Sequence, residues 1–165
     1  MSDQPAPDRE PAAAAAADAA VRFDTRIAVL LRDDLLSWQR LNVTAFLVSG
    51  IAGLPGVLGE PYEDASGRRY LPMLRQPVLV FAAARDQLRA AYERAYERAA
   101  ARAAADPDAV ALSVYTAELF ATPHDAANRA AVRAVASDAL DLVGVAVRGR
   151  KKLVDQLTKG LALHP

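Results

Sequence analysis

The chain has 165 residues, 53% of them apolar, which is enough for one domain with a buried core. Its 20 basic and 20 acidic residues cancel, so a strong overall attraction to nucleic acid is excluded. The absence of cysteine excludes disulfides and thiolate chemistry, and with only two histidines we predict neither a metal nor a cofactor.

Residues 1–21 combine prolines, charges and an alanine run, with almost nothing large to bury. We predict a disordered tail over residues 1–21 and a single domain over residues 22–165. The tail has no basic segment followed by an apolar one, and no later stretch reaches the roughly 18 apolar residues of a membrane span. We therefore expect no membrane association and a cytoplasmic protein.

The first element of the domain is an apolar run at residues 26–31, which predicts a buried strand. Asp33 and Asp34 interrupt the run, and Ser37 is the predicted N-cap of a helix that Gly53 ends. We expect this helix to bury a stripe at spacings of four and three. The stripe consists of Leu41, Ala45, Val48 and Ala52.

The next stretch loses the helical period and is rich in turn formers. Asp64-Ala65-Ser66-Gly67 predicts a tight turn between Tyr62 and Tyr70, so a hairpin should leave the main sheet here. The alternative is a simple loop with two packed aromatic rings. Residues 76–81 then predict a second buried strand.

The second half of the chain alternates in the same way. Residues 85–104 predict an amphipathic helix, followed by a strand at 110–115, a short helix at 125–134, a strand at 142–147 and a closing helix. This order predicts an α/β fold: a three-layer α/β/α sandwich around a four-stranded mixed, mainly parallel sheet. The last strand could run antiparallel, because no single long crossover helix precedes it.

Open α/β sheets bind ligands beyond the carboxyl ends of their strands, and this rule selects loops 32–42 and 116–128. We predict that they form one crevice that holds a small ligand. The expected ligand-binding residues are Arg32, Asp33, Trp38, Gln39, Asn42, Thr116, Glu118 and Asn128.

Two residues are candidates for a general base. Asp34 stands beside Asp33, and two neighbouring carboxylates can share a proton; a capping aspartate is the plainer alternative. His124 stands beside Asp125, which could orient its imidazole, although a surface histidine after a proline turn explains the same residues. No nucleophile motif accompanies either residue.

Four segments of the sequence resemble the domain of unknown function two-thousand family. They are residues 32–53, 59–83, 115–132 and 141–165, and the resemblance covers nearly everything from Arg22 to Pro165. Only the tail and the alanine-rich stretch at 100–109 look like additions of this chain.

That family is in turn similar to the type II peptidyl-tRNA hydrolases. Arg32, Asp34 and Leu35 fall in the hydrolase pattern Arg-Thr-Asp-Leu, and this resemblance implies the sandwich fold and a homodimer. Further matches are Leu142, Gly144, Val154, Asp155, Thr158 and Leu161.

The chain departs from the hydrolases at the positions that carry their chemistry. Gln39, Leu41 and Val48 stand where the hydrolases have lysines and a histidine on the first helix. Residues 125–128 echo only part of the hydrolase Asp-Ala-Gly-x-Thr loop. Peptidyl-tRNA hydrolysis by the family mechanism is therefore not expected.

Three functions stay open from the sequence. The first is a ligand-binding domain that uses the crevice, with nucleic acid not expected as a partner. The second is a hydrolase of an ester or amide, of aminoacyl or peptidyl-RNA type, with His124 or Asp34 as base. The third is a dimeric scaffold, favoured if Trp38, Tyr92 and Tyr96 share a flat apolar surface.

Overall fold

The computed structural model describes residues 22–100 and 109–165. The predicted disordered tail at 1–21 and most of the alanine-rich stretch therefore lie outside the described residues. Each of the four predicted strands forms within the described ranges, and a short fifth strand joins them in one sheet. The strands of this sheet are β1 (Thr25–Arg32), β4 (Val78–Ala83), β5 (Ala111–Thr116), β6 (Leu142–Arg150) and β7 (Ala162–Leu163).

The sheet is mixed, with the strand order β5-β6-β1-β4-β7. Strands β1 and β4 pair in parallel, while the other three neighbouring pairs are antiparallel. The predicted α/β class and mixed sheet are confirmed, whereas the prediction of four, mainly parallel strands is wrong, because the sheet has five strands and only β1 and β4 pair in parallel. β6 runs antiparallel because the chain returns from β5 at the same end of the sheet, with Thr116 paired to Leu142.

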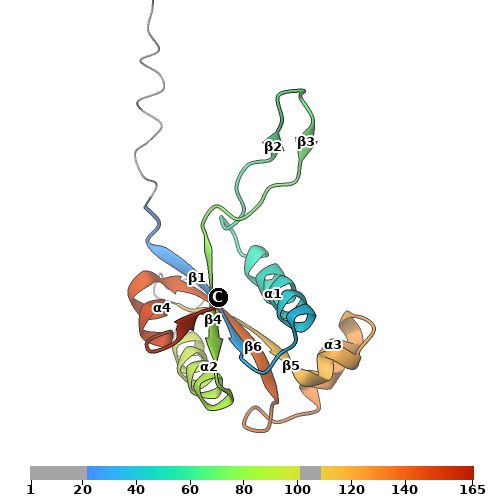
Figure 1. Cartoon of the computed structure of the whole chain (residues 1–165), viewed down its shortest axis with the longest axis vertical. Helices are drawn as coiled ribbons and strands as arrows, with labels where there is room; N and C mark the ends of the chain where they lie inside the picture. The colour runs from blue at the N-terminus through green and yellow to red at the C-terminus, as the bar shows by residue number, and fades with distance from the viewer. Residues whose placement is uncertain (1–21, 101–108) are drawn as a thin grey trace, which may run out of the picture.

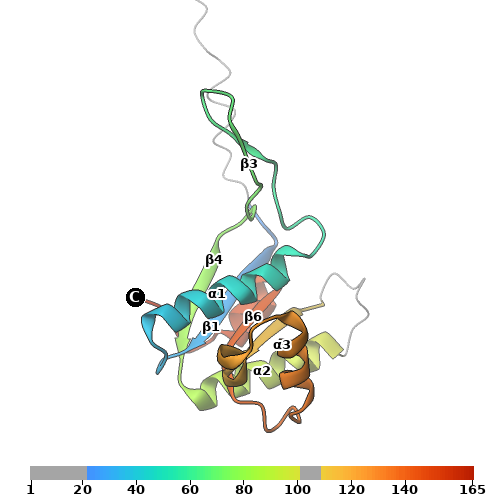
Figure 2. The same cartoon turned by 90° about the vertical axis from the view of Figure 1, so that its right-hand side faces the viewer.

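Helices cover both faces of the sheet (Figures 1 and 2). α1 (Ser37–Ala52) packs on one face over Ile27, Val29 and Leu31 of β1. α2 (Arg85–Ala100) and α4 (Lys151–Leu157) pack on the other face, over Ala28 and Leu30. The alternation of β1 side chains between the two cores follows from the two-residue period of a strand.

The connection from β5 to β6 holds the remaining helical turns. The 3₁₀ turn η1 (Ala117–Ala121) follows β5 directly, and α3 (Asp125–Arg133) follows it near the predicted position. Figures 1 and 2 both show α3 close to α1. The β5–β6 connection therefore lies beside α1.

The buried stripe of α1 differs from the predicted one. Val43, Leu47 and Ile51 are buried against the sheet, whereas Leu41 is 74% exposed. The cause is an apolar composition around most of the helix, so its pattern does not single out one face. Leu36 rather than Ser37 is the N-cap, and its backbone N–H donates to Gln39 Oε1 at 2.9 Å. The amphipathic helix predicted from Arg85 forms as α2, and its buried residues include Leu88, Tyr92 and Ala95.

Residues 57–77 form the predicted hairpin, which extends away from the body as an arm (Figures 1 and 2). Strands β2 (Tyr62–Glu63) and β3 (Arg69–Tyr70) pair Tyr62 with Tyr70, and Gly67 adopts φ +79° in the turn. Both tyrosines are about half exposed, so the alternative of two packed rings is wrong.

Among the described helices, none is long and apolar enough to cross a membrane.

Candidate functional site: an aromatic pocket between α1 and the β5–β6 connection

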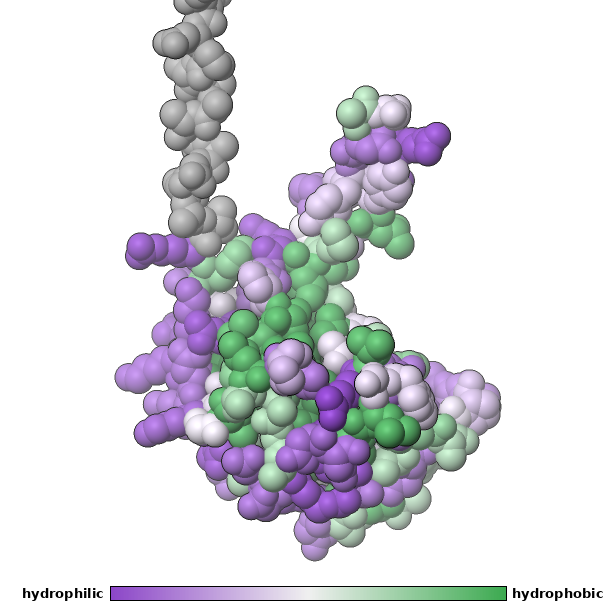
Figure 3. Space-filling view, in the orientation of Figure 1, coloured by the Kyte–Doolittle hydropathy of each residue, from purple (hydrophilic) through white to green (hydrophobic). Residues whose placement is uncertain are grey.

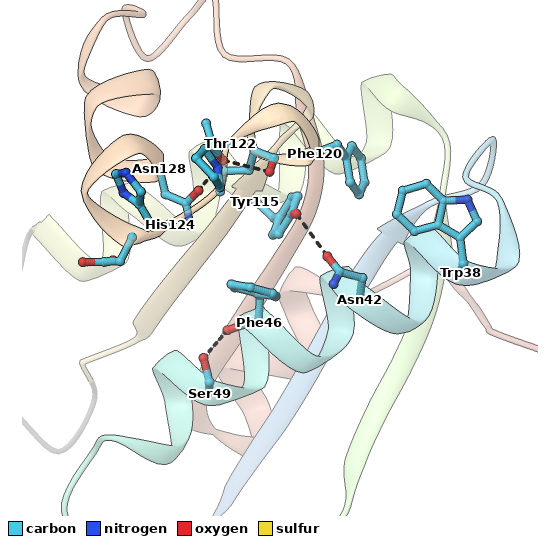
Figure 4. A pocket seen from close by; sticks show the side chains of 12 residues that line it. Trp38, Asn42, Phe46, Ser49, Tyr115, Phe120, Thr122, His124 and Asn128 are labelled. Atoms are coloured by element: carbon cyan, nitrogen blue, oxygen red, sulfur yellow. Dashed lines mark hydrogen bonds between the residues drawn. The ribbon is translucent and has the colours of Figure 1, made fainter.

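A pocket of about 440 Å³ opens between α1 and the segment that follows β5 (Figure 4). The segment supplies one wall, α1 supplies the opposite wall, and Tyr115 lies between them. The lining residues are Trp38, Asn42, Phe46, Ser49, Tyr115, Leu119, Phe120, Thr122, Pro123, His124, Asp125 and Asn128. Loops 32–42 and 116–128 both contribute to this list, so the two predicted loops meet at one cavity.

α1 turns one side of its surface toward the pocket. Trp38, Asn42 and Phe46 are spaced by four residues, which places them above one another on one side of a helix. The neighbouring side, with Val43 and Leu47, is buried against the sheet. Packing of the helix on the sheet thus fixes the orientation of the pocket-lining side chains.

Aromatic rings form a continuous chain along the pocket. Trp38 meets Phe120 edge to face at 5.6 Å between ring centroids, and Phe120 meets Tyr115 at 5.1 Å. Tyr115 in turn meets Phe46 at 5.8 Å. Trp38 and Phe46 keep 56% and 51% of their surface exposed, so the chain of rings offers apolar area to a bound molecule.

The polar groups of the pocket are each partly satisfied within the protein. The Tyr115 hydroxyl donates to Asn42 Oδ1 at 3.1 Å, and burial raises the pKa of this phenol. The Thr122 hydroxyl lies 2.9 Å from the Leu119 carbonyl and also contacts Asn128 Oδ1. The Ser49 hydroxyl donates to the Phe46 carbonyl at 2.6 Å.

His124 is the N-cap of α3. Its Nδ1 accepts a hydrogen bond from the Ala127 backbone N–H at 3.2 Å, so the proton of the ring is on Nε2. Asp125 does not orient the imidazole, because its carboxylate is bound by Arg129 one turn along the helix. Among the described residues, the predicted contact between the Asp125 carboxylate and the His124 imidazole is therefore absent.

Four of the ten predicted site residues line the pocket: Trp38, Asn42, His124 and Asn128. The other six lie outside its lining. They are Arg32, Asp33, Asp34, Gln39, Thr116 and Glu118.

Arg32 and Asp34 belong to a separate charged cluster. The Arg32 guanidinium donates to Asp34 at 2.6 Å and to Asp141 at 2.7 Å, and Asp141 also pairs with Arg85. Burial would lower the pKa of Arg32, but its hydrogen bond to Asp34 and the charge of Asp141 raise it. Asp33 is exposed and binds Arg40 through its backbone carbonyl. The expected carboxylate pair is thus replaced by an ion-pair network.

The remaining predicted residues have structural environments. The side chain of Gln39 accepts a hydrogen bond from the Leu36 backbone N–H and so caps the N-terminus of α1. Thr116 is fully buried, and its hydroxyl has no hydrogen-bond partner among the described residues. One carboxylate oxygen of Glu118, Oε2, is likewise buried without a partner among them.

Sequence reasoning missed mainly the aromatic part of the pocket. Phe46 and Ser49 lie on the third and fourth turns of α1, beyond the loop that the strand-end rule selects. Tyr115 lies in β5 itself and is 4% exposed. In the sequence it therefore looks like any other core residue of an apolar strand. The spacing of Trp38, Asn42 and Phe46 was the available signal. The described residues hold no group of three or more metal-ligating side chains.

Comparison with known proteins gives a family and a structural relative, both without an assigned function. The family model described as "Protein of unknown function (DUF2000)" matches residues 25–165. A solved structure of a protein of unknown function from Agrobacterium tumefaciens strain C58 is 46% identical, with a TM-score of 0.77; the match covers 87% of this chain and 100% of the other. No curated protein matches significantly. The chain therefore belongs to the DUF2000 family.

Proposed function

We propose that this protein binds a small ligand in the pocket between α1 and residues 115–128. The observation that carries the proposal is the chain of four aromatic rings around a cavity of about 440 Å³. This volume is within the usual range for small-molecule sites, which combine apolar walls with a few polar groups. Asn42, Thr122 and Asn128 are such groups.

The proposal is tested by the thermal stability of the protein with a set of small aromatic compounds. A ligand that binds the folded state alone raises the melting temperature. We expect Trp38→Ala to abolish the shift, because it removes the end of the ring chain without opening the core. Tyr96→Ala is the matched control, since Tyr96 is 54% exposed on α2 and does not line the pocket. Equal shifts in both variants would refute this location.

A hydrolase with His124 as base is the second candidate. In its favour, the Nε2 side of His124 makes no capping contact, and two hydroxyls, those of Ser49 and Thr122, line the same cavity. Both hydroxyls donate to backbone carbonyls rather than to the imidazole, and Asp34 is bound by Arg32. The enzyme would be supported if the natural protein hydrolyses a p-nitrophenyl ester and the His124→Ala variant does not. Equal rates of hydrolysis in the two proteins would argue against it.

We also propose a distant fold relationship with the type II peptidyl-tRNA hydrolases. Helices on both faces of a mixed sheet support the sandwich architecture that this relationship implies. The fold relationship would be supported by a superposition that aligns β1, α1, β4 and α2 with the hydrolase elements in the same order.

We also propose a cytoplasmic, reducing compartment for the binding function, which the absence of cysteine supports.

A further inference from the structure

We infer that the ligand of this pocket is an uncharged, planar ring system whose edge carries hydrogen-bond acceptors, such as a heteroaromatic amide or a nucleobase. The inference rests on the proposed binding function and adds the chemical class of the ligand. It is carried by the charges and by the hydrogen-bonding groups that line the cavity.

The lining provides no net charge to hold an ion. Among the described residues, no lysine or arginine lines the pocket, and Asp125 is paired with Arg129. His124 accepts at Nδ1 from the Ala127 N–H, which only the neutral imidazole can do. A charged ligand would lose its hydration without gaining a partner of opposite charge, and this cost favours an uncharged one.

The two amides of the pocket are the second part of the argument. Asn42 and Asn128 are the only asparagines in the sequence, and both line this cavity. Asn42 uses its carbonyl oxygen for the Tyr115 hydroxyl, which leaves its NH₂ group as a donor. The Asn42 amide can therefore donate a hydrogen bond to the edge of a planar ligand, as amide side chains do with nucleobases.

Asn128 presents the same group. The Thr122 hydroxyl contacts both the Leu119 carbonyl, at 2.9 Å, and Asn128 Oδ1. Because Asn128 Oδ1 faces this hydroxyl, the NH₂ group of Asn128 is left as a donor. With the NH₂ group of Asn42 and the Nε2–H of His124, the lining offers three donors to a ligand.

The rings explain why the ligand should be planar. Trp38, Phe120, Tyr115 and Phe46 line the cavity with ring faces and edges; Asn42 lies among them, and Asn128 lies beside Thr122 and His124 (Figure 4). A flat ring can contact aromatic faces over its whole surface while its polar edge reaches the amides. An aliphatic ligand of the same volume would use fewer of these contacts.

The test compares four compounds on one bicyclic ring by calorimetry and by NMR of the full chain. Quinoline-3-carboxamide carries an uncharged carbonyl acceptor, quinoline-3-carboxylate is an anion, 3-(aminomethyl)quinoline is a cation, and 3-methylquinoline lacks the polar substituent. We expect the carboxamide to bind about tenfold more tightly than each of the others, the worth of one or two good hydrogen bonds.

The outcomes separate the inference from the proposed function. If the carboxylate or the amine binds as tightly as the carboxamide, or if all four bind equally, the inference on ligand class is wrong while the pocket remains a binding site. If none of the four shifts the amide resonances of residues 115–128, the proposed function is wrong as well.

Asn42→Asp supplies a second measurement in a variant that keeps the side-chain shape and the acceptor for Tyr115. It replaces the donor with a carboxylate, so we expect the carboxamide to bind more weakly and the aminomethyl compound more tightly. Gln156→Glu makes the same change of charge on the exposed surface of α4 and should alter neither affinity. An unchanged order of affinities in Asn42→Asp would overturn the inference.

Discussion

Tyr115 joins the hydrophobic core to the pocket. Its ring is 4% exposed and contacts both Phe46 and Phe120, while its hydroxyl donates to Asn42. A single buried residue thus contacts both walls of the pocket. Loss of its hydroxyl should lower the stability of the fold and leave the Asn42 side chain less ordered.

Tyr115→Phe removes this hydrogen bond and keeps the ring. We expect a loss of about 1 kcal/mol in the free energy of unfolding, because a typical hydrogen bond contributes ~0.5–1.5 kcal/mol and Asn42 is only half-buried. Urea unfolding measures the difference. A variant as stable as the natural protein would show that the Tyr115–Asn42 contact contributes nothing.

The natural protein and the Tyr115→Phe variant also test how the free energy of unfolding depends on pH. Burial raises the pKa of Tyr115 above its usual 10.0, so folding favours the neutral phenol. Its contribution to stability is complete below pH 10.0 and is lost as the pH rises through the folded-state pKa. We expect the advantage of the natural protein over Tyr115→Phe to stay constant below pH 10.0 and to shrink over the interval above it, as the pH rises through the folded-state pKa. A constant difference across this interval would contradict the assignment.

At the scale of elements, the contact between α1 and β6 sets the position of the pocket wall. A Cβ atom on Gly144 of β6 would lie 2.5 Å from Val43 Cγ1 and 2.9 Å from Leu47 Cδ1. The absence of a side chain at Gly144 therefore lets the helix lie close to the sheet. Any group added there must push α1 outward, together with its pocket-lining side.

Gly144→Ala should destabilise the fold by about 1–3 kcal/mol, the usual cost of overpacking a core. Chemical denaturation measures this, and NMR shifts of residues 38–49 report the displaced helix. Gly53→Ala is the control, because a Cβ there meets its nearest atom at 3.5 Å and φ is −69°. That variant should be as stable as the natural protein or slightly more stable.

The arm is held at its tip by one carboxylate. Asp64 accepts from the Ser66 and Arg68 backbone N–H groups at 2.8 and 3.0 Å and from the Tyr70 hydroxyl at 2.7 Å. The Tyr70 hydroxyl, followed by the Arg68 and Ser66 amides, lowers the pKa of Asp64 below its usual 3.8. The tip thus depends on the ionised carboxylate.

We expect the tip to keep its structure above pH 3.8 and to lose it as the pH falls through the lower, folded-state pKa of Asp64. Amide shifts of Ser66 and Arg68 in an NMR titration should give a midpoint below 3.8, while resonances of the sheet stay unchanged. Asp64→Asn should show the low-pH shifts already at neutral pH. A midpoint above 3.8 would contradict the hydrogen bonding at the tip.

The elements differ in how much of them the sequence reveals. Apolar runs located the four long strands, and the turn residues at 64–67 located the arm, because both signals are local. The place of β6 between β1 and β5 depends on long-range pairing, and β7 has only two residues, too few for any pattern. The loops of the site were predictable from strand ends. Phe46 and Tyr115 were not, because pocket-lining rings and core rings look alike in sequence.

For the molecule as a whole, an apolar surface crosses the face seen in Figure 3, around the C-terminal end of the chain. It includes a groove between α1 and β4, where Leu41 is 74% exposed. Exposed apolar areas of this kind typically mark contacts with another protein. The surface lined by Leu41, Ala45, Val48, Val78, Val80 and Pro165 is called the apolar groove below.

The expected homodimer remains a prediction, and we propose that the apolar groove is its interface. Leu41→Glu should convert a dimer to a monomer in sedimentation, because it places a charge where apolar area would be buried. Tyr96→Glu is the control, since this half-exposed ring lies on α2, across the sheet. A natural protein that sediments as a monomer would refute the dimer. Trp38, Tyr92 and Tyr96 do not share the flat apolar surface that would favour a dimeric scaffold, because Tyr92 is buried and Trp38 lies in the pocket.

Trp38 is the only tryptophan in the sequence, and it lies at the end of the ring chain in contact with Phe120. All indole emission of the protein therefore comes from the rim of the proposed binding site. Because the ring is 56% exposed, its spectrum should report hydration of that rim. Occupancy of the pocket can thus be followed optically in the unlabelled chain, and the kinetics of ligand entry can be read without a dye.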